Sequence, residues 1–209
     1  MKRAFGIILL IGLSMFGYSQ SKTEFGVTTE GSWFTPRPID KYSEPNHNGW
    51  DTGIGVYASR IIFWRLSADI GIAYRYKQFQ QHYGEFGYEG NLYGSSTQGE
   101  GWKKYPLHYV VMPVHLQLLT GKYFFLRGGI EASWLTNYNI GNKKTEYNWT
   151  MGFGSQKYKL KWSVNYIRGF KEVGFLTGQY EIENEKYYTG ASYQNQMFQL
   201  NFSYPIWQK

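Results

Sequence analysis

Apolar and polar residues alternate with a period of two over most of the chain after residue 23. The alternation is clearest in residues 66–76, where Ile70 and Tyr74 fall on one face and Asp69 and Arg75 on the other. Successive side chains of a strand point to opposite faces, so this pattern predicts a strand with one apolar and one polar face. The same parity recurs in eight segments: residues 24–33, 52–59, 66–76, 109–118, 124–134, 148–155, 158–166 and 197–204.

The connections between these segments also alternate, in length. Those after the second, fourth and sixth segments are short, near residues 61–65, 119–122 and 156–157. The other four are long and cover residues 34–51, 78–106, 135–147 and 168–194. An up-and-down barrel collects all the long loops at one end, as membrane barrels of bacteria do. The pattern predicts an all-β fold, an eight-stranded antiparallel up-and-down transmembrane β-barrel with four long extracellular loops.

A soluble sandwich or lipocalin-like barrel would alternate as well, with its apolar face turned inward. The apolar faces here carry large aromatic residues near the segment ends, among them Trp33, Trp134 and Trp149. Aromatic residues at both ends of the strands are typical of the two interfacial girdles of a membrane barrel. This feature favours the membrane barrel over the soluble alternative.

The N-terminus has the three parts of a secretory signal peptide. Two basic residues precede the apolar stretch 4–17, and Gly17 and Ser19 place small residues at the −3 and −1 positions of a cleavage site. The stretch is shorter than the roughly 20 apolar residues of a membrane-spanning helix. We therefore expect a cleaved signal peptide over residues 1–19 and a barrel domain over residues 20–209, exported to the outer membrane of a Gram-negative cell.

Composition narrows the chemistry. The 209 residues include no Cys, which excludes disulfides, thiolate metal sites and a cysteine nucleophile. The formal charge is +7, of which the predicted signal peptide supplies +2, so +5 remains. That charge on an exported protein needs no nucleic acid to explain it, and the expected surroundings are outer-membrane lipid.

Two stretches of sequence resemble the PorT-like outer-membrane β-barrel family. Residues 109–129 combine a Pro within a strand, a tight turn and an aromatic strand that runs into Gly residues, as in the central hairpin of that family. Residues 198–204 resemble the terminal aromatic strand that the barrel-insertion machinery reads. The resemblance implies a small barrel, and the family's namesake takes part in a protein-secretion system. One departure is that residues 205–209 extend past the terminal aromatic residue.

The polar faces predict the content of the barrel interior. Eight strands enclose a space that side chains just fill, so a wide channel is not expected. Seven charged residues share the inward parity and are expected to pair: Glu30, Asp69, Arg75, Arg127, Glu131, Lys159 and Lys161. Two interpretations stay open, a plug of ion pairs that rigidifies the barrel and a narrow gated channel whose pairs exchange partners.

Histidine is the main candidate for catalysis. His47, His82 and His108 fall in or beside the long loops, and His115 lies on an inward face. A lipid-modifying barrel enzyme would need a rim His beside a Ser and a carboxylate, and no Ser lies in a recognisable nucleophile motif. No ligand spacing supports a metal site. We therefore expect no enzyme activity, no metal and no cofactor.

The long connections are rich in aromatic residues among Gly and polar residues. Such segments are typical of recognition surfaces, because Tyr and Trp bring contact area at low entropic cost. An equally open interpretation is that they pack together as a lid. The candidate recognition residues are Trp50, Phe86, Tyr88, Tyr93, Trp102, Tyr180, Tyr187 and Tyr188.

These observations predict a small, non-catalytic outer-membrane barrel whose surface loops bind an envelope partner or a surface ligand. Three alternatives remain: an accessory subunit of a secretion or uptake complex, a lipid-modifying enzyme with a rim His, and a narrow gated channel.

Overall fold

Nine strands form a single closed sheet. The computed structural model describes residues 22–35, 37–38, 46–83, 101–137, 145–157, 159–182 and 185–209, so the predicted signal peptide lies outside the described residues. The strands are β1 (Thr23–Phe34), β2 (Arg37–Pro38), β3 (Asn46–Phe63), β4 (Leu66–Tyr83), β5 (Gly101–Leu119), β6 (Phe124–Leu135), β7 (Thr145–Ser155), β8 (Lys161–Ile182) and β9 (Glu185–Gln208). Among the described residues, no helix has the length and apolar character needed to cross a membrane.

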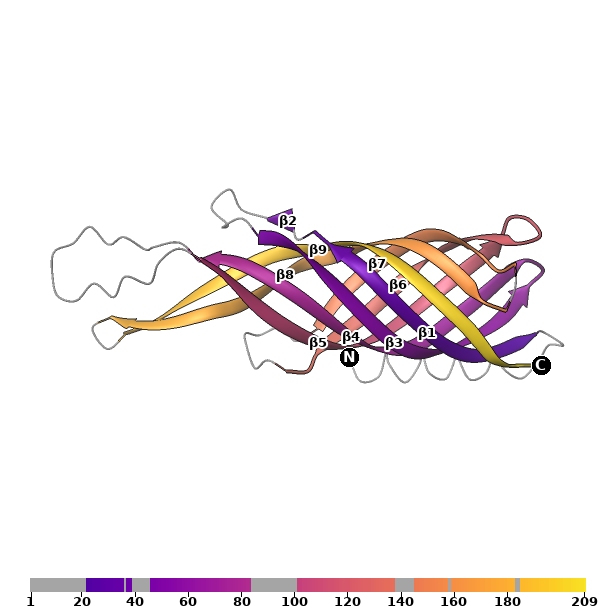
Figure 1. The fold of residues 1–209 in the computed structure, drawn as a ribbon, viewed down its shortest axis with the longest axis horizontal. Coiled ribbons are helices and arrows are strands. Elements are labelled where there is room, and N and C mark those ends of the chain that lie inside the picture. Colours follow the sequence, from indigo (N-terminus) through magenta and orange to yellow (C-terminus); the bar gives the residue numbers. More distant parts are fainter. Residues whose placement is uncertain are drawn as a thin grey trace.

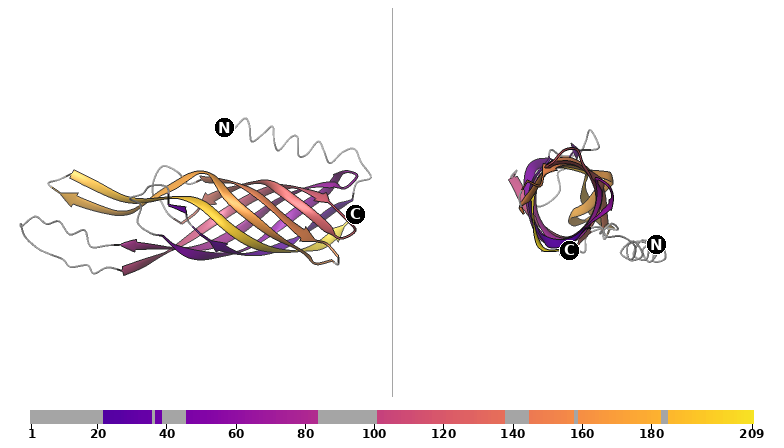
Figure 2. Two further views of the ribbon diagram at one scale, coloured as in Figure 1. Left: turned by 90° about the horizontal axis from the view of Figure 1, so that it is seen from above. Right: turned by 90° about the vertical axis from the view of Figure 1, so that its right-hand side faces the viewer.

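The eight long strands follow one another around a barrel. Each pairs antiparallel with its neighbour in the chain, β1 pairs with β9 to close the ring, and the two-residue β2 adds to the edge of β9. Figure 1 shows the tilted strands from the side, and the end-on view in Figure 2 shows the closed ring. The predicted eight-stranded antiparallel barrel is confirmed.

Two ends of the barrel can be told apart (Figure 1). At the end called here the turn end, tight turns join β3 to β4, β5 to β6 and β7 to β8. The first strand, β1, begins at this end, and the last strand, β9, ends there. The turn between β3 and β4 is short enough to need the left-handed conformation of Trp64, with φ of 42°. At the opposite end, called the hairpin end, β8 and β9 continue beyond the barrel wall (Figure 2).

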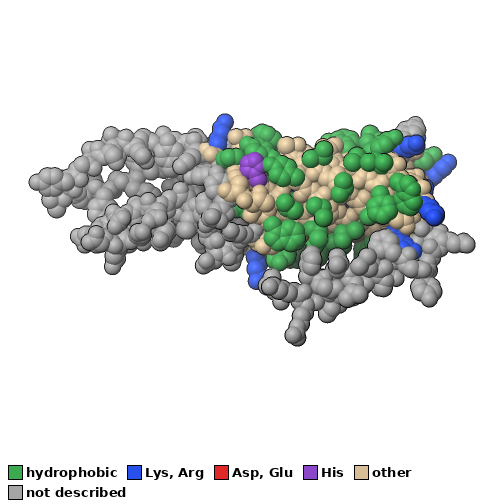
Figure 3. Space-filling view, turned by 90° about the horizontal axis from the view of Figure 1, so that it is seen from below, with side chains coloured by type: hydrophobic (Ala, Val, Ile, Leu, Met, Phe, Trp, Pro, Cys, Tyr) green, Lys and Arg blue, Asp and Glu red, His purple; other side chains and the backbone are tan. Residues whose placement is uncertain are grey.

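The outer surface of the barrel is apolar. Ile54 and Ile72 are 65% and 59% exposed, whereas the intervening inward residues of the same strands are buried or small. On the face shown in Figure 3, hydrophobic side chains are spread over the barrel wall, and Lys and Arg lie toward its two ends. Because a wall of exposed aliphatic side chains around a polar interior is stable only in lipid, the barrel is built to span a membrane.

The strands are longer than the alternation predicted. β4 runs to Tyr83 and β5 begins at Gly101, inside the predicted loop 78–106, and most of the predicted loop 168–194 is a hairpin of β8 and β9. The predicted bounds of these two long connections were therefore wrong. Apolar and polar residues alternate only where the two faces of a strand meet different surroundings, and backbone pairing continues past the lipid without that pattern.

The end of the chain completes the barrel seam. The extension after residue 204 stays in β9, where Trp207 pairs with Phe25 and the backbones of Thr23 and Lys209 exchange hydrogen bonds of 2.9 and 3.0 Å. A register shift occurs beside Gly26. A Cβ at Gly26 would lie 2.3 Å from the Tyr204 carbonyl oxygen, so only glycine allows this close approach.

Candidate functional site: the barrel interior

An arginine held between two glutamates occupies the middle of the lumen. Arg75 of β4 donates from Nε to Glu30 Oε1 of β1 at 2.6 Å and from Nη1 to Glu131 Oε1 of β6 at 2.8 Å. A third bond, from Nη2 to Glu131 Oε2 at 3.1 Å, makes the second contact bidentate. Asn148 and Gln199 donate further bonds to the two glutamates. We call Glu30, Arg75 and Glu131 the central clamp, because they join three strands across the lumen.

Arg127 organises the interior between the central clamp and the turn end. Its Nη2 donates to His115 Nδ1 at 2.7 Å and lies 3.9 Å from Asp69 Oδ2, and its Nη1 donates to Ser163 Oγ at 3.2 Å. Since a guanidinium only donates, the Nδ1 of His115 must accept, and the ring carries its proton on Nε2. Gln117 donates to the same Asp69 carboxylate.

A further ion pair lies at the turn end itself. The ammonium of Lys161 in β8 bonds Glu24 Oε1 of β1. The hydroxyl of Tyr57 donates to the same oxygen at 2.9 Å, and Gln208 Nε2 donates to Glu24 Oε2 at 3.0 Å. Residues from the first and last strands therefore meet on one carboxylate, which ties the seam of the barrel together.

Lys77 fills the lumen toward the hairpin end. Its Nζ donates to Asn195 Oδ1 at 3.0 Å and lies 3.8 Å from the centre of the Phe34 ring, a cation–π distance. The hydroxyl of Tyr109 bonds Glu146. The side chains of Lys77 and Phe34 are almost wholly buried, so this end of the lumen is packed as well.

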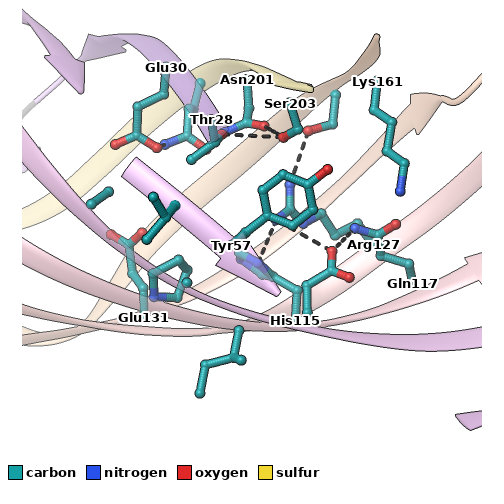
Figure 4. A pocket seen from close by; sticks show the side chains of 18 of the residues that line it. Thr28, Glu30, Tyr57, His115, Gln117, Arg127, Glu131, Lys161, Asn201 and Ser203 are labelled. Atoms are coloured by element: carbon teal, nitrogen blue, oxygen red, sulfur yellow. Dashed lines mark hydrogen bonds and ion pairs between the residues drawn. The ribbon is translucent and has the colours of Figure 1, made fainter. Parts of the chain in front are cut away.

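One cavity between the described side chains of the lumen is small. A cavity of about 40 Å³ lies between the central clamp and the turn end. Tyr57, His115, Arg127 and Lys161 surround it in Figure 4, with Glu30 and Glu131 on one side. One water needs roughly 10–15 Å³ of such volume, so the cavity has room for a few waters at most.

Six of the seven predicted interior charges meet as the alternation predicted. Glu30, Asp69, Arg75, Arg127, Glu131 and Lys161 all face the lumen and pair there. The seventh was placed wrongly. Lys159 is exposed in the turn before β8, because that strand begins at Lys161 rather than at residue 158.

Four further charged residues of the lumen were left out of the predicted network. Glu24, Asp51, Lys77 and Glu146 are each less than one-tenth exposed. All four share the inward parity of their strands. Glu24 opens the predicted segment 24–33 but was left out of the network, whereas Asp51, Lys77 and Glu146 lie one or two residues outside segments 52–59, 66–76 and 148–155. Extending the parity by two residues would have found these three, since a strand keeps its side-chain alternation along its whole length.

The predicted recognition residues lie in different parts of the structure. Trp50 is not in a loop, because it lies in β3 on the outer face, with its ring centre 5.6 Å from that of Tyr76. The backbones of Trp102, Tyr180, Tyr187 and Tyr188 lie in strands at the hairpin end. Phe86, Tyr88 and Tyr93 lie outside the described residues.

The three histidines predicted in or beside the long loops lie in strands instead. His108 faces outward in β5, where it bonds the Tyr74 hydroxyl and its ring centre lies 5.3 Å from that of Tyr76. His47 and His82 fall in β3 and β4. Within the described part of the chain, no group of three or more His, Cys, Asp or Glu residues could hold a metal ion.

The fold and its surface define a class, the small membrane-spanning β-barrels. The chain is similar to the crystal structure of Ail, the attachment invasion locus protein of Yersinia pestis, with 10% identity, a TM-score of 0.39, and coverage of 90% of this chain and 100% of Ail. It is also similar to outer membrane protein W of E. coli, with 10% identity, a TM-score of 0.38, and coverage of 88% and 97%.

A third similar structure is the outer membrane protein AlkL in lipid bilayers, with 13% identity, a TM-score of 0.40, and coverage of 91% of this chain and 92% of AlkL. No protein-family model and no curated protein sequence matches the chain.

Proposed function

We propose that the chain is a small, non-catalytic outer-membrane barrel whose hairpin end binds a protein partner of the cell envelope. The apolar outer wall supports residence in a membrane, and the packed lumen leaves the segments beyond the barrel as the surface available for recognition. The alternative is that these segments bind a surface ligand.

The hairpin of β8 and β9 is the observation that carries this proposal. Pairing between β7 and β8 ends at Asn148 and Gly169, whereas β8 and β9 stay paired out to Ile182 and Glu185. The hairpin thus projects roughly 35 Å past residue 171, at about 3.3 Å per residue. In the described pairings, the other edge of β8 has no neighbour along residues 170–182.

An open strand edge recognises a partner through its backbone. Its N–H and C=O groups pair with an extended segment of another protein, and side chains on alternate positions add selectivity. Tyr180 and Tyr187 are cross-strand partners near the tip of this hairpin, and Tyr188 follows. Aromatic residues at such a position suit a binding role.

Affinity purification from gently solubilised outer membranes, followed by mass spectrometry, tests the proposal. We expect a partner with the intact chain and loss of that partner when a short turn replaces residues 172–193. A variant shortened within residues 86–100 is the matched control, because it changes the other long connection at the same end. Both variants must show the folded mobility of a barrel in unheated gels.

Recovery of the same partner with both variants would contradict a binding role of the hairpin end. A partner at fixed stoichiometry would favour the accessory subunit of a secretion or uptake complex that the PorT-like resemblance implies. The terminal strand would meet the barrel-insertion machinery during assembly in either case.

Catalysis and conduction are the less favoured functions. His115 is engaged by Arg127 and His108 by Tyr74, and neither lies in a bonded Ser-His-carboxylate arrangement among the described residues. Replacing His47, His82 and His108 by alanine should therefore leave the lipid profile of the membrane unchanged. An altered lipid profile would instead favour the alternative of a lipid-modifying enzyme with a rim His.

A further inference from the structure

Asp51 carries a buried carboxylate whose two oxygens both lack a hydrogen-bond partner. The residue lies in β3 toward the hairpin end and is 2% exposed. It shares the inward parity of Gly53 and so points into the lumen. Burying an ionised carboxylate without a partner is very unfavourable, so a counter-ion or a proton must neutralise it.

The neighbour of Asp51 on β1 has the same property. Ser32 is the direct cross-strand partner of Asp51, it is 8% exposed, and its Oγ has no hydrogen-bond partner either. Three oxygen atoms of two adjacent inward side chains are therefore available to one ligand. Oxygen atoms without competing nitrogen donors are ligands that hard cations prefer.

The ammonium group on the neighbouring strand is engaged elsewhere. Lys77 is the cross-strand partner of Asp51 on its other side, but its ammonium donates to Asn195 and lies against the Phe34 ring. The described lumen as a whole has too few cations. It holds six carboxylates and four cationic side chains: Glu24, Glu30, Asp51, Asp69, Glu131 and Glu146 against Arg75, Lys77, Arg127 and Lys161.

We propose that Asp51 and Ser32 form a binding site for a monovalent alkali cation inside the barrel. A single carboxylate with a hydroxyl suits a singly charged ion, since the described residues offer no cluster of three or more His, Cys, Asp or Glu for a divalent metal. The bound ion offsets part of the negative excess of the lumen. This site is independent of any partner at the hairpin end.

Thermal unfolding of the chain refolded in uncharged detergent tests the site, with sodium or potassium chloride compared against choline chloride at equal ionic strength. Choline is too large for a packed lumen, so it controls for screening by salt. We expect the Tm to be about 3–6 °C higher in the alkali salts, the shift expected of an ion present at about ten times its Kd. Asp51→Asn should abolish this difference.

Asp69→Asn is the matched control, because that carboxylate is also buried, and its Oδ2, unlike either oxygen of Asp51, accepts a hydrogen bond from Gln117 and lies near Arg127. It should keep the difference between the salts. Should Asp51→Asn fail to fold, Ser32→Ala retains the carboxylate and is expected to reduce the difference.

Equal Tm values of the intact chain in choline and alkali salts would overturn the proposal. So would an alkali-specific stabilisation that persists in Asp51→Asn, which would locate the ion elsewhere. An Asp51→Asn variant more stable than the intact chain in every salt, with no ion dependence in either, would show that a proton neutralises the carboxyl and would also overturn it.

Discussion

Replacing Arg75 by methionine removes the cation of the central clamp while keeping an unbranched side chain that retains part of its packing. The arginine makes three charge-assisted bonds, of 2.6, 2.8 and 3.1 Å, to Glu30 and Glu131. Without it, two carboxylates that are 8% and 3% exposed stay in the lumen with no cation between them. Removing one partner of a buried ion pair costs about 3–5 kcal/mol, so the folding equilibrium should fall on the order of a thousandfold.

Urea titration of the barrel in lipid vesicles, followed by tryptophan fluorescence and by gel mobility, measures this change. The triple variant Glu30→Gln, Arg75→Met, Glu131→Gln removes all three charges and should recover most of the lost stability, because neutral replacement of a buried pair is often nearly neutral. Lys159→Ala, in the exposed turn, is the control and should change stability by less than about 0.5 kcal/mol.

A loss below about 1 kcal/mol in Arg75→Met would refute the reasoning, since it would mean that water reaches and solvates the two glutamates in place of the arginine. An equally large loss in the triple variant would also refute it, because packing rather than charge would then hold the clamp together.

Three further predictions concern the packing and the seam. Gly129→Ala should destabilise the barrel by more than about 1 kcal/mol, because a Cβ there would lie 2.1 Å from a backbone oxygen, whereas Gly121→Ala has nothing within 4 Å and should be near neutral in the same urea titration. The intact chain should pass almost no current in planar bilayers, and Arg127→Ala should raise the conductance by enlarging the cavity of about 40 Å³; an unchanged closed state in the variant would favour a permanent plug. Deleting residues 206–209 removes the last pairing with β1, including the ring contact with Phe25, so it should lower the urea midpoint; an unchanged midpoint would mean that the seam closes without them.

The period-two alternation determined the barrel wall before any tertiary information. Residues such as Ile54, Ile72 and Phe198 were assigned to the apolar face, and all are exposed on the outside of the barrel. The sequence is enough for this because side-chain direction in a strand is local. Each residue points opposite to its neighbours, and lipid on one side selects apolar residues at every second position.

The sequence also located most of the interior charges but not their partners. Glu30 and Arg75 are 45 residues apart, and Glu24 and Lys161 are 137 apart. Which carboxylate meets which cation depends on the stagger of the strands and on the closure of β1 against β9. The alternation within a single strand predicts neither of these. The same stagger places Asp51 beside Lys77, whose ammonium group bonds Asn195 of β9.

The alternation pattern of the sequence and the tertiary structure disagree at the ends of the strands. Beyond the lipid both faces of a strand meet polar surroundings, so the alternation ceases to select one face, and the β8–β9 hairpin was mistaken for a loop. At the turn end, alternation extended through residues 158–160 although β8 starts only at Lys161. Side-chain parity is thus a property of the sequence alone, whereas the length, pairing and closure of the strands come from backbone hydrogen bonds between distant segments, which only the tertiary structure decides.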